Sequence, residues 1–572
     1  MHQSGVRPLT RLVLATAALA TLGIATAASA LGLGPIDLNS LRGYAEAHGV
    51  DTRALPELGT ELLGLDLGTT PRADCGPGSL PETDRQGRVP LADYASGRAA
   101  QGYTCNASEK GSFGQTGGFQ VHRYADAAGR ECAYYDSTLV FPKDVIRGAL
   151  GTIVLDMSDP ANPVQTASLT SPAMLTTHES LRLNTGRGLL VAGAGNPSTQ
   201  VGFVDVWDVS ADCRTPVLRS SLPIGGLGHE GGFSPDGLTY WVTTTALPGI
   251  TAIDLTDPAA PSVVLRDYTY TVHGMSFSAD GDRAYLADSG RDGMTVLDVS
   301  DVQDRVADPA LREISTLTWP EHSIPQNVNP VTIGGQPYAI EFDEFDFTFG
   351  TAPRSVGGVR IIDISDETAP EVVSRIRLEV HDESFRQTDQ RADPGASQPA
   401  QGYAAHYCSV PREVEPGILA CSMIASGLRI FDIRDPLAPR EVAYFNQPAP
   451  VGVPSVEGAY AMSAPAFAPE RGEVWYSDGN TGFYNVQLTA AAWPESGAPV
   501  AAPAAPAPPA AVPAPPAAAP AAPGGPTTAA PPAAPARASR GLPATGLPVA
   551  VALLGAALLG GSAAVARRRR SV

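Results

Sequence analysis

The sequence predicts an all-β fold, a β-propeller assembled from a repeated unit of four short strands. A strand that ends in an aspartate and a turn returns along the middle of the chain. Its copies are spaced like propeller blades, since four short strands and their turns need about 40 residues or more. The chain also contains 59 Gly and 53 Pro residues, and part of this excess divides the chain into short strands.

Six copies of this strand-and-turn motif occur, followed by a degenerate seventh. They read GTIVLDMSDP (151–160), FVDVWDVSAD (203–212), GITAIDLTDP (249–258), GMTVLDVSDV (293–302), GVRIIDISDE (358–367), GLRIFDIRDP (427–436) and GFYNVQLT (482–489). The aligned acids are Asp156, Asp208, Asp254, Asp298, Asp363 and Asp432, with Gln487 in the seventh place. Asp and Ser or Thr bond nearby backbone amides, so the motif is mainly a strand and its turn.

Two longer gaps between copies predict insertions at 338–357 and 379–402. The first contains the acidic and aromatic run EFDEFDFTFG (Glu341–Gly350). We interpret this run as a surface loop, with a partner-binding loop as the alternative. The second stretch is polar, and we expect it to be mobile.

These copies resemble the LVIVD repeat, which is named for a strand ending in Asp. The resemblance covers residues 119–490 and implies a β-propeller of seven blades. The last copy lacks a clear outer strand after Leu488. We therefore expect the N-terminal extension, residues 31–118, to pack partly on the propeller and to supply the strand that closes the ring.

The N-terminal residues 1–30 have the pattern of a secretory signal peptide. Arg7 and Arg11 precede an apolar run from Leu12 to Ile24, and Ala28–Ala30 form a small-residue cleavage site. The mature chain is expected to begin near Leu31.

The C-terminal region has the order of a wall-anchoring signal. Residues 491–541 are rich in Ala and Pro and predict a disordered, extended stalk. Residues 542–572 hold the pentapeptide LPATG, an apolar span at 547–566 that is long enough for a transmembrane helix, and four arginines. The pentapeptide residues are Leu542, Pro543, Ala544, Thr545 and Gly546.

This order resembles a Gram-positive cell-wall sorting signal. The resemblance implies that a sortase cuts after Thr545 and joins it to peptidoglycan. The protein would be membrane-attached before that cleavage and extracellular and wall-anchored after it. An ordinary C-terminal membrane anchor is the alternative.

Charge and cysteine content agree with an exported protein. A net charge of -20 argues against nucleic acid, which needs a basic surface. Six cysteines in an exported chain predict disulfides, and six cysteines allow fifteen pairings. We predict only the Cys408–Cys421 pair, because the residues between them form a turn that joins neighbouring strands.

A histidine stands near the start of the strand that precedes most motif copies. In a propeller this strand lines the central channel, so such histidines would form a ring that can hold one transition metal. The histidines are His122, His178, His229, His273, His322 and His406, with Glu457 in the seventh repeat. The metal-ligand candidates are the four in the most similar contexts: His178, His229, His273 and His406. Glu179 and Glu230 are candidates for the surrounding shell or for a general base.

Two hypotheses follow for function. The first is a wall-anchored surface module that binds an extracellular ligand, because no complete catalytic constellation occurs in the sequence. The second is an extracellular metal-dependent oxidoreductase or hydrolase that uses the histidine ring. A purely structural role is the alternative for the histidines, each tying its strand to a neighbouring blade.

Overall fold

The computed structural model describes most of the region between residues 68 and 496. The described residues are 68–137, 150–194, 202–226, 228–245, 247–320, 323–346, 357–382, 385, 388–394, 402–448 and 458–496. The expected signal peptide, the stalk beyond residue 496, the sorting signal and the C-terminal helix lie outside these residues. Within the described residues, no helix is both long and apolar enough to cross a membrane.

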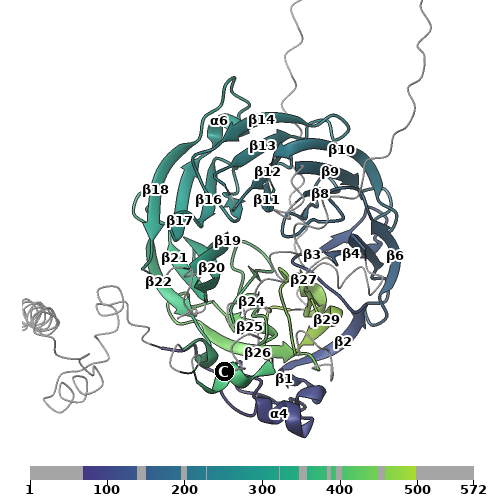
Figure 1. Cartoon of the computed structure of the whole chain (residues 1–572), viewed down its shortest axis with the longest axis vertical. Coiled ribbons are helices and arrows are strands. Elements are labelled where there is room, and N and C mark those ends of the chain that lie inside the picture. Colours follow the sequence, from purple (N-terminus) through teal and green to yellow (C-terminus); the bar gives the residue numbers. More distant parts are fainter. Residues whose placement is uncertain are drawn as a thin grey trace, which may run out of the picture. The chain divides into compact units, whose positions relative to one another are not determined.

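Seven antiparallel sheets surround a central channel, which confirms the seven-bladed propeller (Figure 1). Blades 1 to 3 each follow the chain from the inner strand outward. Blade 1 comprises β3 (Val121–Ala125), β4 (Glu131–Asp136), β5 (Thr152–Asp156) and β6 (Val164–Leu169). Blade 2 comprises β7 (Arg182–Asn184), β8 (Leu189–Gly193), β9 (Gly202–Asp208) and β10 (Val217–Gly226). Blade 3 comprises β11 (Glu230–Phe233), β12 (Thr239–Thr243), β13 (Ile250–Asp254) and β14 (Ser262–Asp267).

Blades 4 to 6 repeat the same strand order. Blade 4 comprises β15 (Met275–Phe277), β16 (Arg283–Asp288), β17 (Gly293–Asp298) and β18 (Arg312–Thr318). Blade 5 comprises β19 (Ser323–Ile333), β20 (Gln336–Asp346), β21 (Val359–Asp363) and β22 (Glu371–Ile376). Blade 6 comprises β23 (Cys408–Ser409), β24 (Ile418–Ser422), β25 (Leu428–Asp432) and β26 (Arg440–Asn446).

The seventh blade is completed by the N-terminal part of the chain, as expected. Its inner three strands are β27 (Ala466–Ala468), β28 (Glu473–Asp478) and β29 (Gly482–Leu488), and β2 (Ala107–Phe113) pairs with β29 as the outer strand. The preceding strand β1 (Tyr103–Cys105) pairs with β26 as a fifth strand of blade 6. Two consecutive N-terminal strands therefore join blades 6 and 7 and close the ring.

Short helices lie between or beside the blades. They are α4 (Leu91–Ser96), α6 (Ser300–Gln303) and the 3-10 turns η2 (Ala99–Gln101), η3 (Glu379–His381), η4 (Asp389–Ala392) and η6 (Pro469–Arg471). The turns η3 and η4 lie in the predicted insertion 379–402. Its buried Asp393 binds Arg88 of the N-terminal extension, so this part of the insertion is tied to the fold.

The motif aspartates have the structural role that the sequence predicts. Each of the six ends the third strand of its blade and accepts a hydrogen bond from the backbone amide two residues later. The distances are 2.9 Å for Asp156, 2.9 Å for Asp208, 2.8 Å for Asp254, 3.0 Å for Asp298, 2.8 Å for Asp363 and 3.1 Å for Asp432. These carboxylates start the turn to the outer strand.

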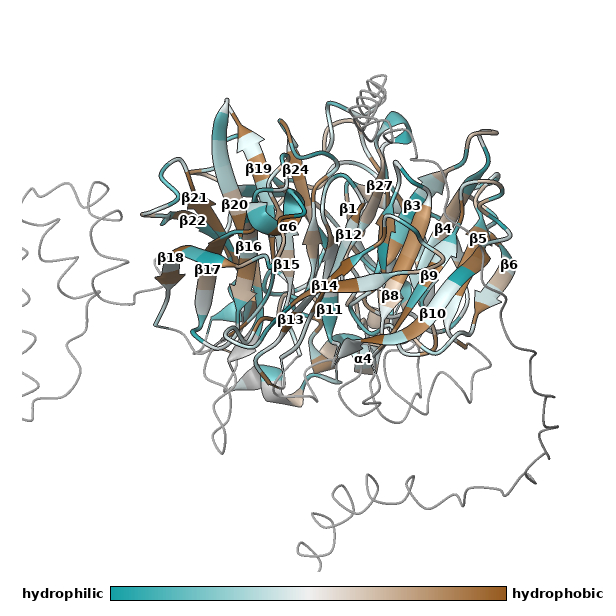
Figure 2. Cartoon of the chain, turned by 90° about the horizontal axis from the view of Figure 1, so that it is seen from above, coloured by the Kyte–Doolittle hydropathy of each residue, from teal (hydrophilic) through white to brown (hydrophobic). Residues whose placement is uncertain are grey.

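Apolar side chains pack between neighbouring blades and form the core. Between blades 2 and 3, for example, Val191 and Val206 pack with Tyr240 and Ile253, and all four are buried. In Figure 2 the most hydrophobic stretches lie on strands, while the connecting loops are mostly hydrophilic or neutral. Burying a side chain of this kind is worth about 1.5–3 kcal/mol, so each blade interface is a major source of stability.

The prediction of an insertion at 338–357 is wrong for residues 338–346. Residues Gln336–Asp346 form β20, the second strand of blade 5, and residues 347–356 lie outside the described part. The acids Glu341, Asp343 and Glu344 are buried rather than exposed on a surface loop. Arg360 on β21 pairs with both Glu341 and Asp343, and its guanidinium lies 3.9 Å from the centre of the Trp319 ring.

Three disulfides use all six cysteines. They join Cys75 to Cys105, Cys132 to Cys213 and Cys408 to Cys421. The predicted Cys408–Cys421 pair is confirmed, and it links β23 to β24 within blade 6. Disulfides persist in oxidising environments, so their presence agrees with an exported protein.

Candidate metal centre

Three of the candidate histidines occupy equivalent places in their blades. His229, His273 and His406 each lie one or two residues before an inner strand begins. The backbone amide of each donates to a carbonyl on the second strand of the same blade, at Thr243, Ala287 and Ser422, over 2.8, 2.9 and 3.0 Å respectively. The propeller symmetry then directs the three imidazoles toward one another at one mouth of the channel.

His178 reaches the same place by a different backbone route. Its φ angle is 50°, a left-handed conformation that a side chain other than glycine seldom adopts. The next residue, Glu179, is buried at 2 % exposure and points into the ring. Strained backbone of this kind persists only where the surrounding structure holds it, and it is common at functional sites.

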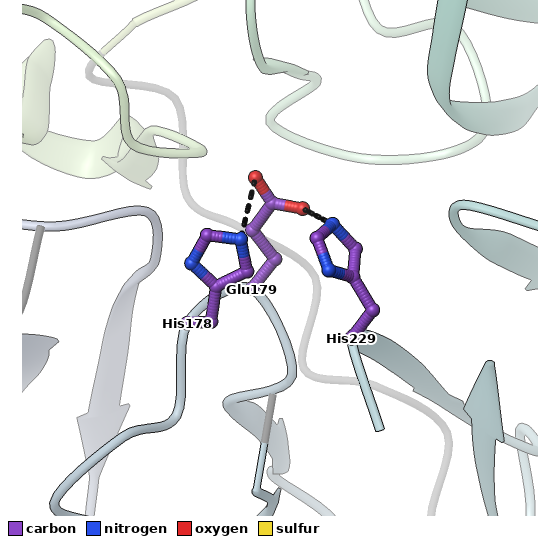
Figure 3. Close-up of side chains that lie close together, drawn as sticks. All are labelled: His178, Glu179 and His229. Atoms are coloured by element: carbon purple, nitrogen blue, oxygen red, sulfur yellow. Dashed lines mark ion pairs between the residues drawn. The ribbon is translucent and has the colours of Figure 1, made fainter. Parts of the chain in front are cut away.

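Glu179 lies among the histidines rather than behind them, and Figure 3 shows its carboxylate between His178 and His229. Its Oε2 atom is 3.1 Å from Nε2 of His229 and 3.2 Å from Nε2 of His273. Its Oε1 atom is 3.4 Å from Nε2 of His406 and 4.0 Å from Nε2 of His178. All four metal-ligand candidates therefore surround one carboxylate, and each oxygen of that carboxylate faces two of them.

The contacts of Nδ1, the ring nitrogen that faces away from Glu179, show which nitrogen carries the hydrogen in two of the histidines. Nδ1 of His273 lies 3.0 Å from the Gln326 carbonyl, and Nδ1 of His406 lies 2.7 Å from the Met462 carbonyl. A carbonyl oxygen only accepts, so both Nδ1 atoms carry a hydrogen. In the neutral imidazoles the lone pairs on Nε2 consequently face the Glu179 carboxylate.

Glu230 supports the cluster from the channel side. Its Oε2 atom lies 3.2 Å from Nδ1 of His273, while Oε1 accepts hydrogen bonds from Arg182 and Asn327. The side chain is fully buried. This arrangement is the one expected for a residue that orients a metal-binding histidine through its outer nitrogen.

Glu344 belongs to the site and was missed by the sequence analysis. It lies on β20, and its Oε1 atom is 2.8 Å from Nε2 of His406. The acidic run that contains Glu344 has the composition of an exposed loop. Its order of acids and aromatics lacks the strict two-residue alternation of a half-buried strand, because Asp343 and Glu344 are adjacent, so the sequence contains no clear signal for this residue.

The charges of the cluster shift several pKa values. Burial lowers the pKa of His178 to about 3, although Glu179 opposes the shift. Burial raises the pKa of Glu179, but the neighbouring histidines outweigh it and hold that pKa well below its ordinary value. Burial lowers the pKa of His406, but Glu344 and Glu179 raise it to about 10. The carboxylates thus favour a positive charge, a proton or a metal, beside His406.

Solvent reaches the cluster from one side. The side chain of His178 is 24 % exposed and that of His229 is 12 % exposed, whereas His406 is fully buried. Phe119 covers the side between blades 1 and 6, with its ring centre 4.3 Å from that of His178 and 5.4 Å from that of His406.

The other histidines of the series do not join the cluster within the described residues. His122 lies three residues further along its blade than Phe119 and bonds the Leu181 carbonyl over 2.9 Å. In blade 1 the ring position is therefore taken by an aromatic side chain. His322 and Glu457 lie outside the described residues.

A cavity of about 580 Å³ fills the channel next to the cluster. Every inner strand contributes to its wall. The contributing residues include Arg123, Arg182, Phe233, Phe277, Asn329, Ser409 and Phe467. Arg182 also binds Glu230, which contacts His273, so this ion pair lies between the cavity and the metal-ligand candidates.

Comparisons with known proteins find only distant likenesses. No family model matches the sequence, and no curated protein matches it. Hydrazine synthase of Kuenenia stuttgartiensis is 14 % identical with a TM-score of 0.42, and the match covers 66 % of this chain and 97 % of that one. The WD40 domain of Toxoplasma gondii coronin is 8 % identical with a TM-score of 0.42, covering 68 % and 87 %. Likenesses this distant carry no argument about activity.

Proposed function

We propose that this protein is an exported, wall-anchored β-propeller that binds a transition metal ion at the mouth of its channel. The observation that carries the proposal is the convergence of His178, His229, His273 and His406 on the Glu179 carboxylate. Imidazole nitrogen and carboxylate oxygen are common ligands of Zn, Cu, Fe and Ni ions.

The orientation of the histidines supports a cation at this place. When His273 and His406 are neutral, their Nε2 lone pairs face a negative carboxylate, and either a proton or a metal cation at this place makes the contact favourable. Nε2 of His229 also lies within hydrogen-bond distance of Nε2 of His273 and of Oε2 of Glu179, so three potential ligand atoms point at one place. A bound cation would make all of these contacts favourable.

The spacing of three ligand atoms also fits an ion. Nε2 of His229 and Nε2 of His273 are 3.0 Å apart, and each lies 3.1–3.2 Å from Oε2 of Glu179. Ligands bound at about 2.0–2.2 Å from one metal are themselves separated by about 3.0–3.5 Å. An ion lying about 1 Å out of the plane of these three atoms would reach all of them at that bond length.

Solvent access beside His178 leaves room for a further ligand. A metal that keeps an open position can polarise a bound substrate or lower the pKa of a bound water. Glu179 would itself be a ligand in this arrangement, and Glu230 is occupied by Arg182, Asn327 and His273, so neither is free to act as a general base. The site thus supports metal-dependent chemistry on a small molecule, and it leaves the choice between hydrolysis and oxidation open.

Metal-dependent melting tests this proposal. The full chain is treated with chelator, and its melting temperature is compared with and without Zn²⁺. At a concentration of one hundred times Kd, an ion that binds only the folded state adds about 2.7 kcal/mol of stability. His229→Gln with His273→Gln should clearly reduce the shift, while His122→Gln should keep it. A wild-type melting temperature that does not respond to the metals named above contradicts the proposal.

Wall anchoring rests on the order of the C-terminal segments, LPATG followed by an apolar span and four arginines. The three disulfides agree with an exported location. The test is linkage to peptidoglycan in the native host. Leu542→Ala with Pro543→Ala should leave the protein unlinked, whereas Pro548→Ala, just beyond the pentapeptide, should be linked normally. Unchanged linkage of the double variant contradicts the sorting function.

The channel cavity favours a second candidate function, a surface module that binds a small ligand without chemistry. Its wall combines aromatic rings with arginine and asparagine side chains, the mixture that binding pockets use. A thermal-shift screen of a metabolite library on metal-free protein would test this candidate. Val410→Trp, which narrows the cavity, should remove any shift found, and an unchanged shift would place the ligand elsewhere.

A further inference from the structure

We propose that the centre holds two metal ions and that the Glu179 carboxylate bridges them. This inference rests on the proposed function and extends it. The first ion is the one described above, on His229, His273 and Oε2 of Glu179. The second ion would be bound by His406, Glu344 and Oε1 of Glu179, a set that the sequence analysis did not assign.

The division of the cluster around Glu179 is the first observation for two ions. Oε2 lies within 3.2 Å of two imidazole nitrogens and Oε1 lies 3.4 Å from a third. A carboxylate that offers each oxygen to a different set of ligands is suited to bridging two cations. Two-metal centres place their ions about 3.5–4 Å apart, a distance that one carboxylate can span.

The orientation of His406 is the second observation. This imidazole is fully buried, and its Nδ1 hydrogen is committed to the Met462 carbonyl. Among the described residues its Nε2 atom has no hydrogen-bond partner, although Glu344 Oε1 lies only 2.8 Å away. This nitrogen and this oxygen can share a proton as an ion pair, and a metal ion bound by both can take the place of that proton.

Glu344 distinguishes the two halves of the centre. The first half has its extra carboxylate, Glu230, behind His273 on the outer nitrogen. The second half has its extra carboxylate in direct contact with the inner nitrogen of His406. Glu230 is already neutralised by Arg182, whereas no ion pair with an arginine or lysine is found for Glu344 among the described residues. Glu344 is therefore available as a metal ligand.

His178 lies where a fourth ligand or a substrate would approach the second ion. Its Nε2 atom is 4.0 Å from Oε1 of Glu179, and its side chain is partly exposed. A water placed between two ions beside His178 would be open to solvent and activated by both cations. This geometry suits a small ligand that enters from the His178 side and bridges the pair.

Metal stoichiometry tests the inference. Chelated full-length wild type, Glu344→Gln, His406→Gln and His229→Gln with His273→Gln are each titrated with Zn²⁺ by calorimetry. The bound zinc is then counted by elemental analysis after dialysis. We expect two ions per chain in the wild type and one in Glu344→Gln and His406→Gln. Glu344→Gln keeps the size of the side chain, and metal-free melting curves confirm that each variant folds.

The outcomes separate this inference from the proposed function. In one outcome the wild type binds a single ion, which Glu344→Gln and His406→Gln retain and the His229 and His273 variant loses. This result overturns the second ion but keeps the proposed function. Two ions in both the wild type and Glu344→Gln also overturn it, because the second ion would then lie elsewhere. No bound zinc in the wild type overturns both. A Co²⁺- or Mn²⁺-loaded sample adds a spectroscopic check, since two bridged ions couple magnetically and a single ion does not.

Discussion

Gly274 leaves the space that the Glu230 carboxylate occupies. A β-carbon at position 274 would collide with Oε2 of Glu230 and would lie 2.5 Å from the Gln326 carbonyl. Both of those atoms contact Nδ1 of His273. The absence of a side chain at Gly274, directly before the inner strand β15 of blade 4, therefore allows the outer contacts that orient a metal-ligand candidate.

Gly274→Ala is expected to weaken metal binding without removing a ligand. The new methyl group would displace Glu230 from His273, and loss of such an orienting partner typically costs 10- to 100-fold in metal affinity. Zinc titration monitored by calorimetry measures the change. Gly193→Ala is the matched control, because its β-carbon would meet neighbours only at 3.6 Å or more. Equal affinities for the two variants would show that Glu230 does not position His273.

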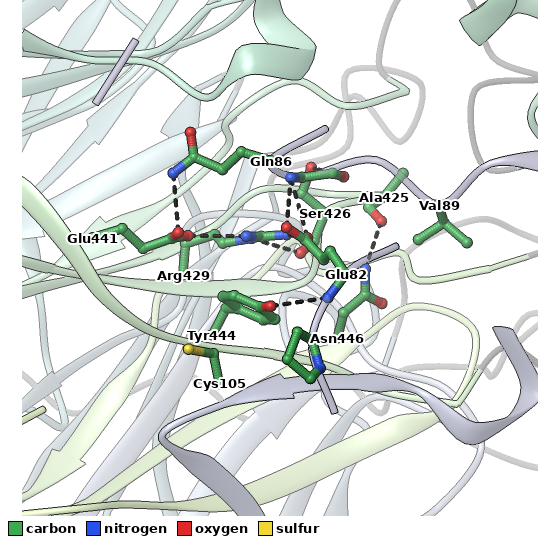
Figure 4. A network of polar contacts seen from close by, with 12 residues as sticks. Glu82, Gln86, Val89, Cys105, Ala425, Ser426, Arg429, Glu441, Tyr444 and Asn446 are labelled. Atoms are coloured by element: carbon green, nitrogen blue, oxygen red, sulfur yellow. Dashed lines mark hydrogen bonds and ion pairs between the residues drawn. The ribbon is translucent and has the colours of Figure 1, made fainter. Parts of the chain in front are cut away.

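Arg429→Met is expected to destabilise the fold. Arg429 is fully buried and pairs with Glu82 and with Glu441, the latter over 2.9 Å (Figure 4). Removing the cation leaves two buried carboxylates, a change that typically costs about 3–5 kcal/mol. Urea unfolding measures the loss. Arg412→Met, at an exposed position, should cost far less, and a similar cost for both would contradict a structural role for this network.

The network in Figure 4 also explains why the N-terminal extension stays on the propeller. Glu82 and Gln86 come from the extension, whereas Arg429 and Glu441 come from blade 6. Burial raises the pKa of Glu82 and the positive charge of Arg429 opposes that shift. Loss of Arg429 should consequently loosen β1 and β2 as well, which hydrogen exchange of their amides would detect.

The three disulfides are expected to differ in their contribution to stability. Cys132–Cys213 joins blades 1 and 2 across 81 residues, whereas Cys408–Cys421 spans 13 residues within one blade. Chain-entropy arguments give about 4.5 kcal/mol for the long loop and about 3 kcal/mol for the short one. Paired Cys→Ala variants studied by calorimetry should show the larger loss for Cys132 and Cys213. The reverse order would contradict the entropic explanation.

His122 is expected to make stability depend on pH. Burial lowers its pKa to about 4, below the value of about 6.5 in an unfolded chain. The neutral form is therefore favoured in the fold, so the contribution is fully present above pH 6.5 and is lost as the pH falls toward 4. The loss is at most about 3 kcal/mol. His122→Asn should flatten this part of the stability curve, and an unchanged curve would contradict the assignment.

Much of this architecture can be predicted from the sequence because repeats impose equivalence. The six aspartates end equivalent strands, and four histidines from four blades meet at the axis. Glu344 could not be predicted, because a run rich in acids has the composition of an exposed loop. Only the structure shows that Arg360 pairs with the neighbouring acids Glu341 and Asp343 and so allows the run to form a buried strand. The sequence predicts Glu179 in the shell around the histidines. Its central position depends on the left-handed backbone at His178, which the sequence does not reveal.

In blade 1 the sequence repeat predicts the wrong residue for the ring position. The sequence offers His122 as its ring histidine, yet Phe119 faces the cluster and His122 lies three residues further along. A shift of three residues along a strand moves a side chain both to another level of the channel and to the other face. Register within a blade is fixed by pairing with β4, which the periodicity of the sequence does not specify.

Anomalous X-ray diffraction from zinc-loaded crystals would locate the ion itself. We expect a zinc peak about 2.0–2.2 Å from Nε2 of His229, Nε2 of His273 and Oε2 of Glu179. A map with no peak within bonding distance of these three atoms, in crystals grown with zinc in excess, would contradict this expectation.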